Sequence, residues 1–144
     1  MKVNNKRLPP VRRGFVQEED AARLILGDDF AEEQCLFISE VKILLDAQRE
    51  NKAGSDKNAT GVYQSTFDYV NQFARFKNQD TVREVRQFLS GENLESFEVA
   101  QLANLCCEEA EEARTLIPSL VDKKDEEPLQ ALLNEMLTLK KFQT

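Results

Sequence analysis

The sequence contains no histidine and no tryptophan, and only three of its 144 residues are cysteines. Without histidine, no Ser-His or Cys-His pair can activate a nucleophile, and the common zinc and iron ligand sets shrink to thiolates and carboxylates. The cysteines (Cys35, Cys106 and Cys107) are odd in number and form no CxxC spacing. We therefore expect reduced thiols, no catalytic residue and no metal site.

Glycine is also scarce, and its five copies match neither the Rossmann nor the P-loop spacing, so we expect no nucleotide or other cofactor. No apolar run approaches the roughly 20 residues that a membrane-spanning helix needs. The basic N-terminal stretch also lacks the apolar centre of a signal peptide. These absences favour a protein that works in the cytoplasm or nucleus, without a membrane.

Acidic residues outnumber basic ones by 26 to 19, which gives a net charge of −7. A protein that binds nucleic acid through its whole surface is expected to be basic, so this composition disfavours direct binding. The charge is uneven, because residues 1–13 carry five basic side chains and no acid, which leaves −12 on the rest. We expect residues 1–17 to be a flexible basic tail, with candidate contacts to RNA at Lys2, Lys6, Arg7, Arg12 and Arg13.

Apolar residues recur at helical spacing through most of the remaining sequence. One such stripe is Val99, Leu102, Ala103 and Cys106, and another is Leu129, Leu132, Leu133 and Met136. Further helices are predicted near 39–49, 62–76, 80–90 and 108–117, with N-caps at Ser39, Asp80 and Ser96. We expect a buried broad face on the helix that starts at Val62. The predicted fold class is mainly α, with one helical domain over 18–144 and a polar loop at 51–61.

The triplet Leu24, Ile25 and Leu26 is apolar but too short for a helix, and Gly27 bounds it. We interpret it as an extended segment or strand without a partner strand in its own chain. Unpaired backbone groups are satisfied when such a strand joins the sheet of another protein. The alternative is an extended segment that lies on the chain's own helices.

Aromatic and basic residues alternate at Phe73, Arg75, Phe76 and Lys77. Such groups stack on and neutralise single-stranded RNA. The favoured alternative is that both phenylalanines belong to the core and that the cations lie near a helix C-terminus.

The stretches EEDAARLILGDDF (18–30), SEVKILLDAQR (39–49), FARFKN (73–78) and the helical joint at 97–120 occur in an order that resembles the family of small stalk subunits of RNA polymerases. This family includes the fourth-largest subunit of RNA polymerase II and its archaeal counterpart. The resemblance implies a non-catalytic nuclear subunit with a domain akin to the helicase-and-RNase-D C-terminal (HRDC-like) fold. It would form a heterodimer with a larger stalk subunit that carries RNP-like and OB-fold domains.

The resemblance further implies attachment to the polymerase II core, support of initiation, and contact with nascent RNA mainly through the partner. Combined with the unpaired triplet, it places the expected partner interface on eight apolar residues: Leu24, Ile25, Leu26, Leu36, Ile38, Val41, Leu44 and Leu45. Two alternatives remain open. The chain could serve RNA polymerase I, III or an archaeal enzyme, or it could be a free-standing HRDC-like module that binds nucleic acid itself.

Overall fold

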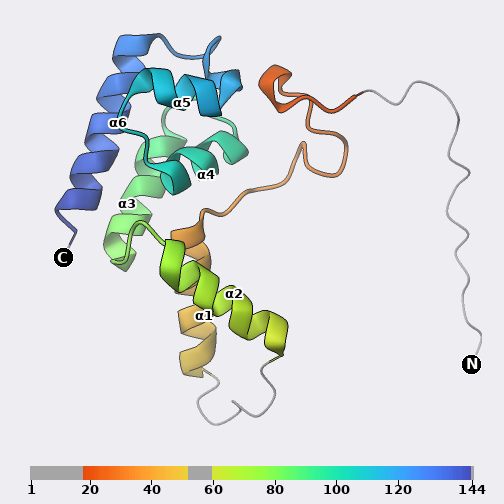
Figure 1. Ribbon diagram of the computed structural model, residues 1–144, viewed down its shortest axis with the longest axis vertical. Helices are drawn as coiled ribbons and strands as arrows, with labels where there is room; N and C mark the ends of the chain where they lie inside the picture. The colour runs from red at the N-terminus through yellow and green to blue at the C-terminus, as the bar shows by residue number, and fades with distance from the viewer. Residues whose placement is uncertain (1–17, 52–59, 144) are drawn as a thin grey trace, which may run out of the picture.

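The structure, a computed structural model, describes residues 18–51 and 60–143 (Figure 1). The described residues form helices and turns, and their only β-type pairing is a single isolated bridge. The mainly α fold class is therefore confirmed. The elements, in chain order, are η1 (Ala21–Arg23), α1 (Ile38–Asn51), α2 (Gly61–Phe73), α3 (Gln79–Ser90), α4 (Ser96–Leu105), α5 (Ala110–Leu116), η3 (Pro118–Leu120) and α6 (Glu126–Lys141).

The core lies between α3, α4, α5 and α6, which form the body of the molecule. The two predicted apolar stripes are both buried there, and Leu89, Leu102 and Leu133 are completely inaccessible to solvent. Each fully buried leucine contributes about 1.5–3 kcal/mol relative to an exposed one. The helical periodicity of the sequence therefore identified the core of the body.

Helices α1 and α2 form a hairpin that projects from this body (Figure 1). The predicted broad buried face of α2 is wrong, because Val70 is its only fully buried residue. Tyr63 and Phe67 are half-buried, whereas Val62 and Tyr69 are exposed. The reason is that α2 packs mainly on the single helix α1, so a second apolar side of α2 faces solvent.

All three predicted N-caps, Ser39 included, lie inside the helices α1, α3 and α4. Helix α3 is capped by Asn78, whose side chain accepts hydrogen bonds from the N–H groups of Asp80 and Thr81. Helix α4 begins at Ser96, after Glu95, and the Glu95 N–H donates to the Glu98 side chain at 2.7 Å. Asp80 is therefore a helical residue, because Asn78 supplies the cap before it. Ser96 is helical as well, because Glu95 and Glu98 form a capping box that starts α4 one residue earlier.

The predicted strand at Leu24–Leu26 is absent, and a closed turn takes its place. The Asp20 side chain accepts a hydrogen bond from Ala22 N–H at 3.0 Å, which starts the short helix η1. Leu24 then adopts a left-handed φ of 60°, and Asp20 and Ile25 form an isolated antiparallel bridge. The prediction failed because it gave these backbone groups no partner, whereas Asp20 supplies both a cap and a pair.

The predicted tail and the predicted loop at 51–61 lie largely in parts of the sequence that the structure does not describe. The basic tail, with its five candidate contacts, lies outside the described residues, as do residues 52–59 of the expected loop. Asn51 and Gly61, which the predicted loop included, end α1 and begin α2. Within the described ranges, no helix combines the length and hydropathy that crossing a membrane requires, and no group of ligating side chains could hold a metal ion.

Candidate partner-binding surface

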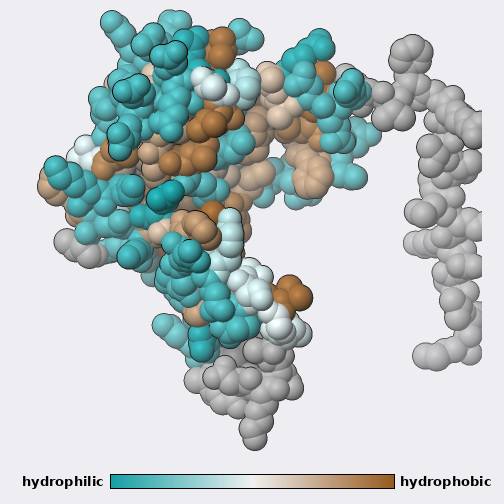
Figure 2. Space-filling view, in the orientation of Figure 1, coloured by the Kyte–Doolittle hydropathy of each residue, from teal (hydrophilic) through white to brown (hydrophobic). Residues whose placement is uncertain are grey.

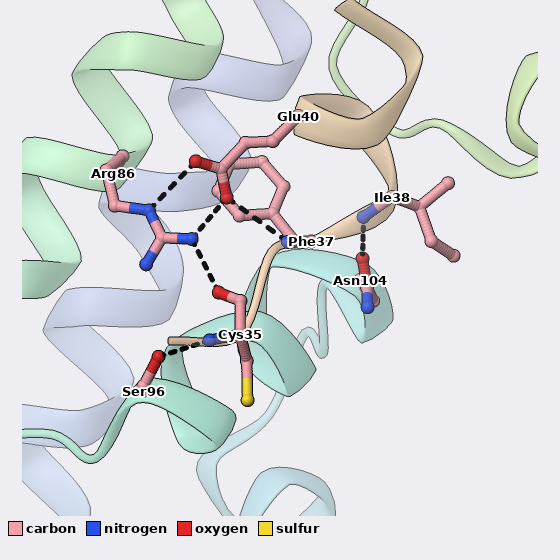
Figure 3. A network of polar contacts seen from close by, with 7 residues as sticks. All are labelled: Cys35, Phe37, Ile38, Glu40, Arg86, Ser96 and Asn104. Atoms are coloured by element: carbon pink, nitrogen blue, oxygen red, sulfur yellow. Dashed lines mark hydrogen bonds and ion pairs between the residues drawn. The ribbon is translucent and has the colours of Figure 1, made fainter. Parts of the chain in front are cut away.

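A network of polar contacts fixes the segment that enters α1 onto the body (Figure 3). Cys35 N–H donates to Ser96 Oγ at 2.6 Å, at the start of α4. Ile38 N–H donates to Asn104 Oδ1 at 2.8 Å, near the end of the same helix. These bonds tie residues 35–38, which lead into α1, to both ends of α4. The Ile38 N–H is one of the amides at a helix start that have no partner within the helix.

Arg86 on α3 connects this segment to the first turn of α1. Its guanidinium pairs with the carboxylate of Glu40, with one N–O distance of 3.0 Å, and it also donates to Cys35 C=O at 2.9 Å (Figure 3). It lies 5.3 Å from the ring centre of the buried Phe37. Glu40 in turn accepts from Phe37 N–H at 3.1 Å. The planar, multi-donor guanidinium suits this arrangement, because it bonds two acceptors while its face covers a ring.

Ser39, predicted as an N-cap, lies inside the first turn of α1 and is buried. Its Oγ accepts from Phe76 N–H at 3.0 Å, and the Phe76 ring meets the Phe37 ring edge-on with centroids 6.4 Å apart. This contact fixes the base of the hairpin from the α2 side. The hairpin is thus held at its base, and its outer part extends away from the core.

The N-terminal segment packs against the body on the other side of this junction. Helix η1 lies beside η3, and a groove of about 430 Å³ separates the segment from the start of α4. Apolar side chains that include Ile25, Leu26, Phe30 and Phe97 line this groove. Figure 2 shows apolar side chains gathered here, together with an isolated apolar group near the outer end of the α1–α2 hairpin.

The structure leaves all eight residues of the expected partner interface outside the fully buried core. Leu24, Leu36 and Leu44 are exposed, with Leu44 at 56%, and the other five are half-buried. They lie in the N-terminal segment, in the segment that enters α1 and on α1 itself, and these three parts follow one another in the sequence. Whether a partner covers them stays a prediction.

Sequence reasoning missed exposed apolar residues on α2 and in the N-terminal segment. Val62 and Tyr69 lie in the first and third turns of α2, on its outer side, and both are exposed. Phe30, which follows the closed turn at 20–25, is exposed as well. The signal was present in α2, because these positions form a second apolar series beside the one through Tyr63 and Phe67. A helix with two apolar sides needs two neighbours, and the described residues supply α2 with one main neighbour.

The buried polar groups of the body form a structural network. The carboxylate of Glu98 is completely buried, accepts from Ser119 Oγ at 2.6 Å and pairs with Lys123 Nζ at 2.9 Å. Burial acts to lower the pKa of Lys123, but hydrogen bonds and charge interactions with Glu98 and Glu95 outweigh it, so the pKa is raised. The network thus holds η3 and the following turn onto α4.

The cysteines are free, as expected from their number and spacing. Burial raises the pKa of both Cys106 and Cys107, although nearby Lys140 and Arg75 partly oppose the shift at Cys106. A raised pKa keeps a thiol protonated and makes it a poor nucleophile at neutral pH. Cys106 also takes a left-handed φ of 48° where α4 ends, so its position is used to stop a helix.

Comparison with known proteins then decides the family. A model of the family described as RNA polymerase Rpb4 matches residues 35–140, from the α1 junction to the end of α6. The chain belongs to the RNA polymerase Rpb4 family. The match spans the body, the hairpin and the polar network that joins them.

Curated relatives agree with this assignment. The chain is 48% identical over 129 residues to "DNA-directed RNA polymerase II subunit rpb4" of Schizosaccharomyces pombe, covering 88% of this chain and 95% of the relative. It is 37% identical over 134 residues to "DNA-directed RNA polymerase II subunit 4" of Arabidopsis thaliana, covering 88% and 97%. Against "DNA-directed RNA polymerase II subunit RPB4" of Saccharomyces cerevisiae, it is 37% identical over 102 residues, which cover 71% of this chain and 43% of the relative. The family resemblance read from the sequence is confirmed.

Proposed function

We propose that this Rpb4-family chain is a non-catalytic subunit of RNA polymerase II and the smaller member of a stalk heterodimer. Two of the relatives described above are named as polymerase II subunits and match almost along their whole lengths. That agreement favours polymerase II over polymerases I and III and the archaeal enzyme. A nuclear location follows from this assignment.

The observation that carries the heterodimer proposal is the projecting hairpin with apolar residues on its outside. Leu44 and Val62 are 56% and 78% exposed on α1 and α2. Continuous with α1 are the exposed Leu36 and the apolar groove beside Leu26. A partner that covers the N-terminal segment and α1 would remove this apolar surface from water, which is the main driving force for stable association.

The partner is proposed to be the larger stalk subunit, with RNP-like and OB-fold domains, as the family resemblance implies. The closed turn at residues 20–25 limits the ways in which the two chains could bind each other. Leu24 is left-handed and its N–H already donates to Ala21 C=O, while Ile25 pairs with Asp20, so strand addition at 24–26 would require this turn to open. Side-chain burial of Leu24, Leu36 and Leu44 is the route that needs no rearrangement.

Initiation and nascent-RNA handling belong to the proposed assembly, with RNA contacted mainly through the larger partner. The acidic body supports this division, because a net charge of −7 opposes binding of phosphates over the whole surface. Within this chain, the basic residues Lys2, Lys6, Arg7, Arg12 and Arg13 are proposed as contacts to RNA or to the polymerase. The HRDC-like character of the body remains part of the proposal.

The test is affinity purification of the tagged full-length chain, followed by identification of the copurifying proteins. We expect the largest subunits of polymerase II and one OB-fold subunit in equal amount to the tagged chain. Largest subunits of polymerase I or III instead would assign the chain to that machine. Recovery of the chain without any polymerase subunit, together with tight RNA binding, would support the free-standing module.

A further inference from the structure

Two segments that are distant in the sequence, and that carry two basic residues each, lie beside each other where α6 ends. The side chain of Gln143 accepts from Lys77 N–H at 2.7 Å and donates to Arg75 C=O at 3.1 Å. This clamp places the α2–α3 connection beside the last turn of α6, which carries Lys140 and Lys141. In Figure 1 the end of α6 accordingly lies near the start of α3. We call Arg75, Lys77, Lys140, Lys141 and Phe142 the Gln143 corner.

These four cations differ from most others in the described chain, because they have no carboxylate partner there. Among the other basic side chains of the described residues, Lys42, Arg83, Arg86, Lys123 and Lys124 form ion pairs, whereas Arg23, Arg49 and Arg114 do not. No ion pair reaches Arg75, Lys77, Lys140 or Lys141 among residues 18–51 and 60–143. The described part of this acidic protein thus keeps four basic side chains without an ion-pair partner near the end of α6.

Helix α6 explains part of this grouping. Cations in the last turn of a helix are stabilised by its dipole, which accounts for Lys140 and Lys141. It does not account for Arg75 and Lys77, which belong to a different segment and are held there by Gln143. Both Arg75 and Lys140 also act electrostatically on the thiol of Cys106, which places their charges near the same point.

The corner also exposes an aromatic ring. Phe142 is 69% exposed, and Lys141 Nζ lies 5.4 Å from its ring centre. By contrast, Phe76 from the predicted aromatic and basic stretch is buried in the core, as the favoured alternative expected. That alternative is wrong for Phe73, which is 42% exposed and packs on the Tyr69 ring of α2 with centroids 4.7 Å apart. The ring that stands beside the cations therefore comes from a different part of the sequence.

We propose that the Gln143 corner contacts single-stranded RNA. Cations that neutralise phosphates beside an exposed ring that can stack on a base are the combination found in single-strand-binding surfaces. An acidic peptide would use the charges but would have no need of the ring. The choice of RNA over single-stranded DNA rests on the proposed function, because the surface chemistry is shared by both.

The test measures binding of a short labelled RNA by the full-length chain at several salt concentrations. All proteins carry glutamine at the five basic positions of residues 1–13, so that the tail does not mask the corner. The corner variant is K77Q/K140Q/K141Q, whose three side chains have no ion pair in the described structure. The matched control is R23Q/K42Q/R49Q, which removes the same charge from the N-terminal segment and α1.

We expect the corner variant to lower the slope of log affinity against log salt by about 2, since each phosphate contact to a single strand contributes about 0.7. The control should change the slope little. Phe142→Leu should weaken binding roughly fivefold or more without changing the salt slope, because stacking is not ionic. Phe30→Leu, at another exposed ring, serves as its control. Thermal unfolding of each variant verifies that the fold is retained.

Equal loss of affinity in the corner variant and its control would overturn the proposal, because net charge would then explain binding. An unchanged salt slope in the corner variant would overturn it as well. A polyglutamate peptide that binds with the same dependence on the corner while RNA does not would assign the surface to acidic protein segments. Much tighter binding of single-stranded DNA than of RNA with the same sequence would assign it to DNA. None of these results depends on the copurification that tests the proposed function.

Discussion

The main chains of Asp20 and Ile25 are joined by two hydrogen bonds, in which the N–H of each residue donates to the carbonyl of the other at 2.8 and 2.9 Å. This pairing turns residues 20–25 into a closed unit that packs beside η3. Because of this pairing, a proline substitution at Ile25 cannot be used to test whether the segment adds a strand to a partner's sheet. Proline would remove a bond within this chain, so a loss of partner binding would not show that the segment joins another sheet.

The first prediction concerns amide exchange at Ile25 in the free chain. We expect the Ile25 amide to exchange roughly tenfold more slowly than in the unfolded chain, because one or two hydrogen bonds in a partly exposed turn give modest protection. Asp20→Ala should abolish this protection by removing the cap that starts the turn. Hydrogen exchange followed by NMR provides the measurement. Unprotected exchange in the free chain, followed by strong protection with the partner, would favour strand addition after all.

The difference between the predicted strand and the observed turn shows what periodicity can detect. The core stripes of α4 and α6 were predictable, because burial on one side of a helix requires apolar residues at helical spacing. The turn depends on one side-chain acceptor, Asp20, and on a left-handed residue, Leu24. Leucine gives no local signal for that conformation, since the left-handed region is unfavourable for residues with a Cβ atom.

The candidate surface was predictable only in part, for a related reason. Sequence reasoning could select Leu44 as an apolar residue of α1, but exposure depends on which helices pack on which. The clamp formed by Gln143 joins positions 66 and 68 residues apart, so no local pattern could reveal the corner. The exposed side of α2 was visible as a second apolar series through Val62 and Tyr69, which the prediction did not take into account.

The second prediction compares two arginines of α3 that differ in their contacts. Arg86→Ala should destabilise the protein by about 2–3 kcal/mol, because it removes hydrogen bonds to Glu40 and Cys35 and leaves that carboxylate half-buried without its partner. Arg83→Ala should change stability by less than about 0.5 kcal/mol, since its pair with Asp80 is 3.7 Å long and exposed. Urea unfolding of both variants gives the comparison. Equal effects would mean that the junction network does not hold α1 on the body.

The third prediction concerns the buried carboxylate of Glu98. Lys123→Met should cost about 3 kcal/mol of unfolding free energy, because it leaves a fully buried charge with Ser119 as its remaining side-chain partner. Adding Glu98→Gln should recover part of this loss, since the amide needs no counter-charge. A double variant that is less stable than Lys123→Met by the full effect of Glu98→Gln alone would show that the two groups are not coupled.

This ion pair also predicts a pH dependence at alkaline pH. The pKa of Lys123 is raised above 10.5 in the folded protein, so the folded state binds its proton more tightly than the unfolded state. The stabilisation is therefore fully present below the ordinary lysine pKa, and it is lost as pH rises through the raised value. The stability difference between the wild type and Lys123→Met should stay constant near neutral pH and shrink above about pH 10.5.

The last prediction tests the hairpin as a partner surface. Leu44→Asp should leave the free chain folded, because this side chain already faces water over more than half of its surface. If a partner covers α1, the substitution should weaken binding by at least about tenfold, since it removes apolar burial and forces a carboxylate out of water. Leu116→Asp, at an exposed leucine at the end of α5, is the matched control and should keep full affinity. Copurification and titration of the purified partner measure both effects. Normal binding by Leu44→Asp and loss of binding by Leu116→Asp would move the interface from the hairpin to the body.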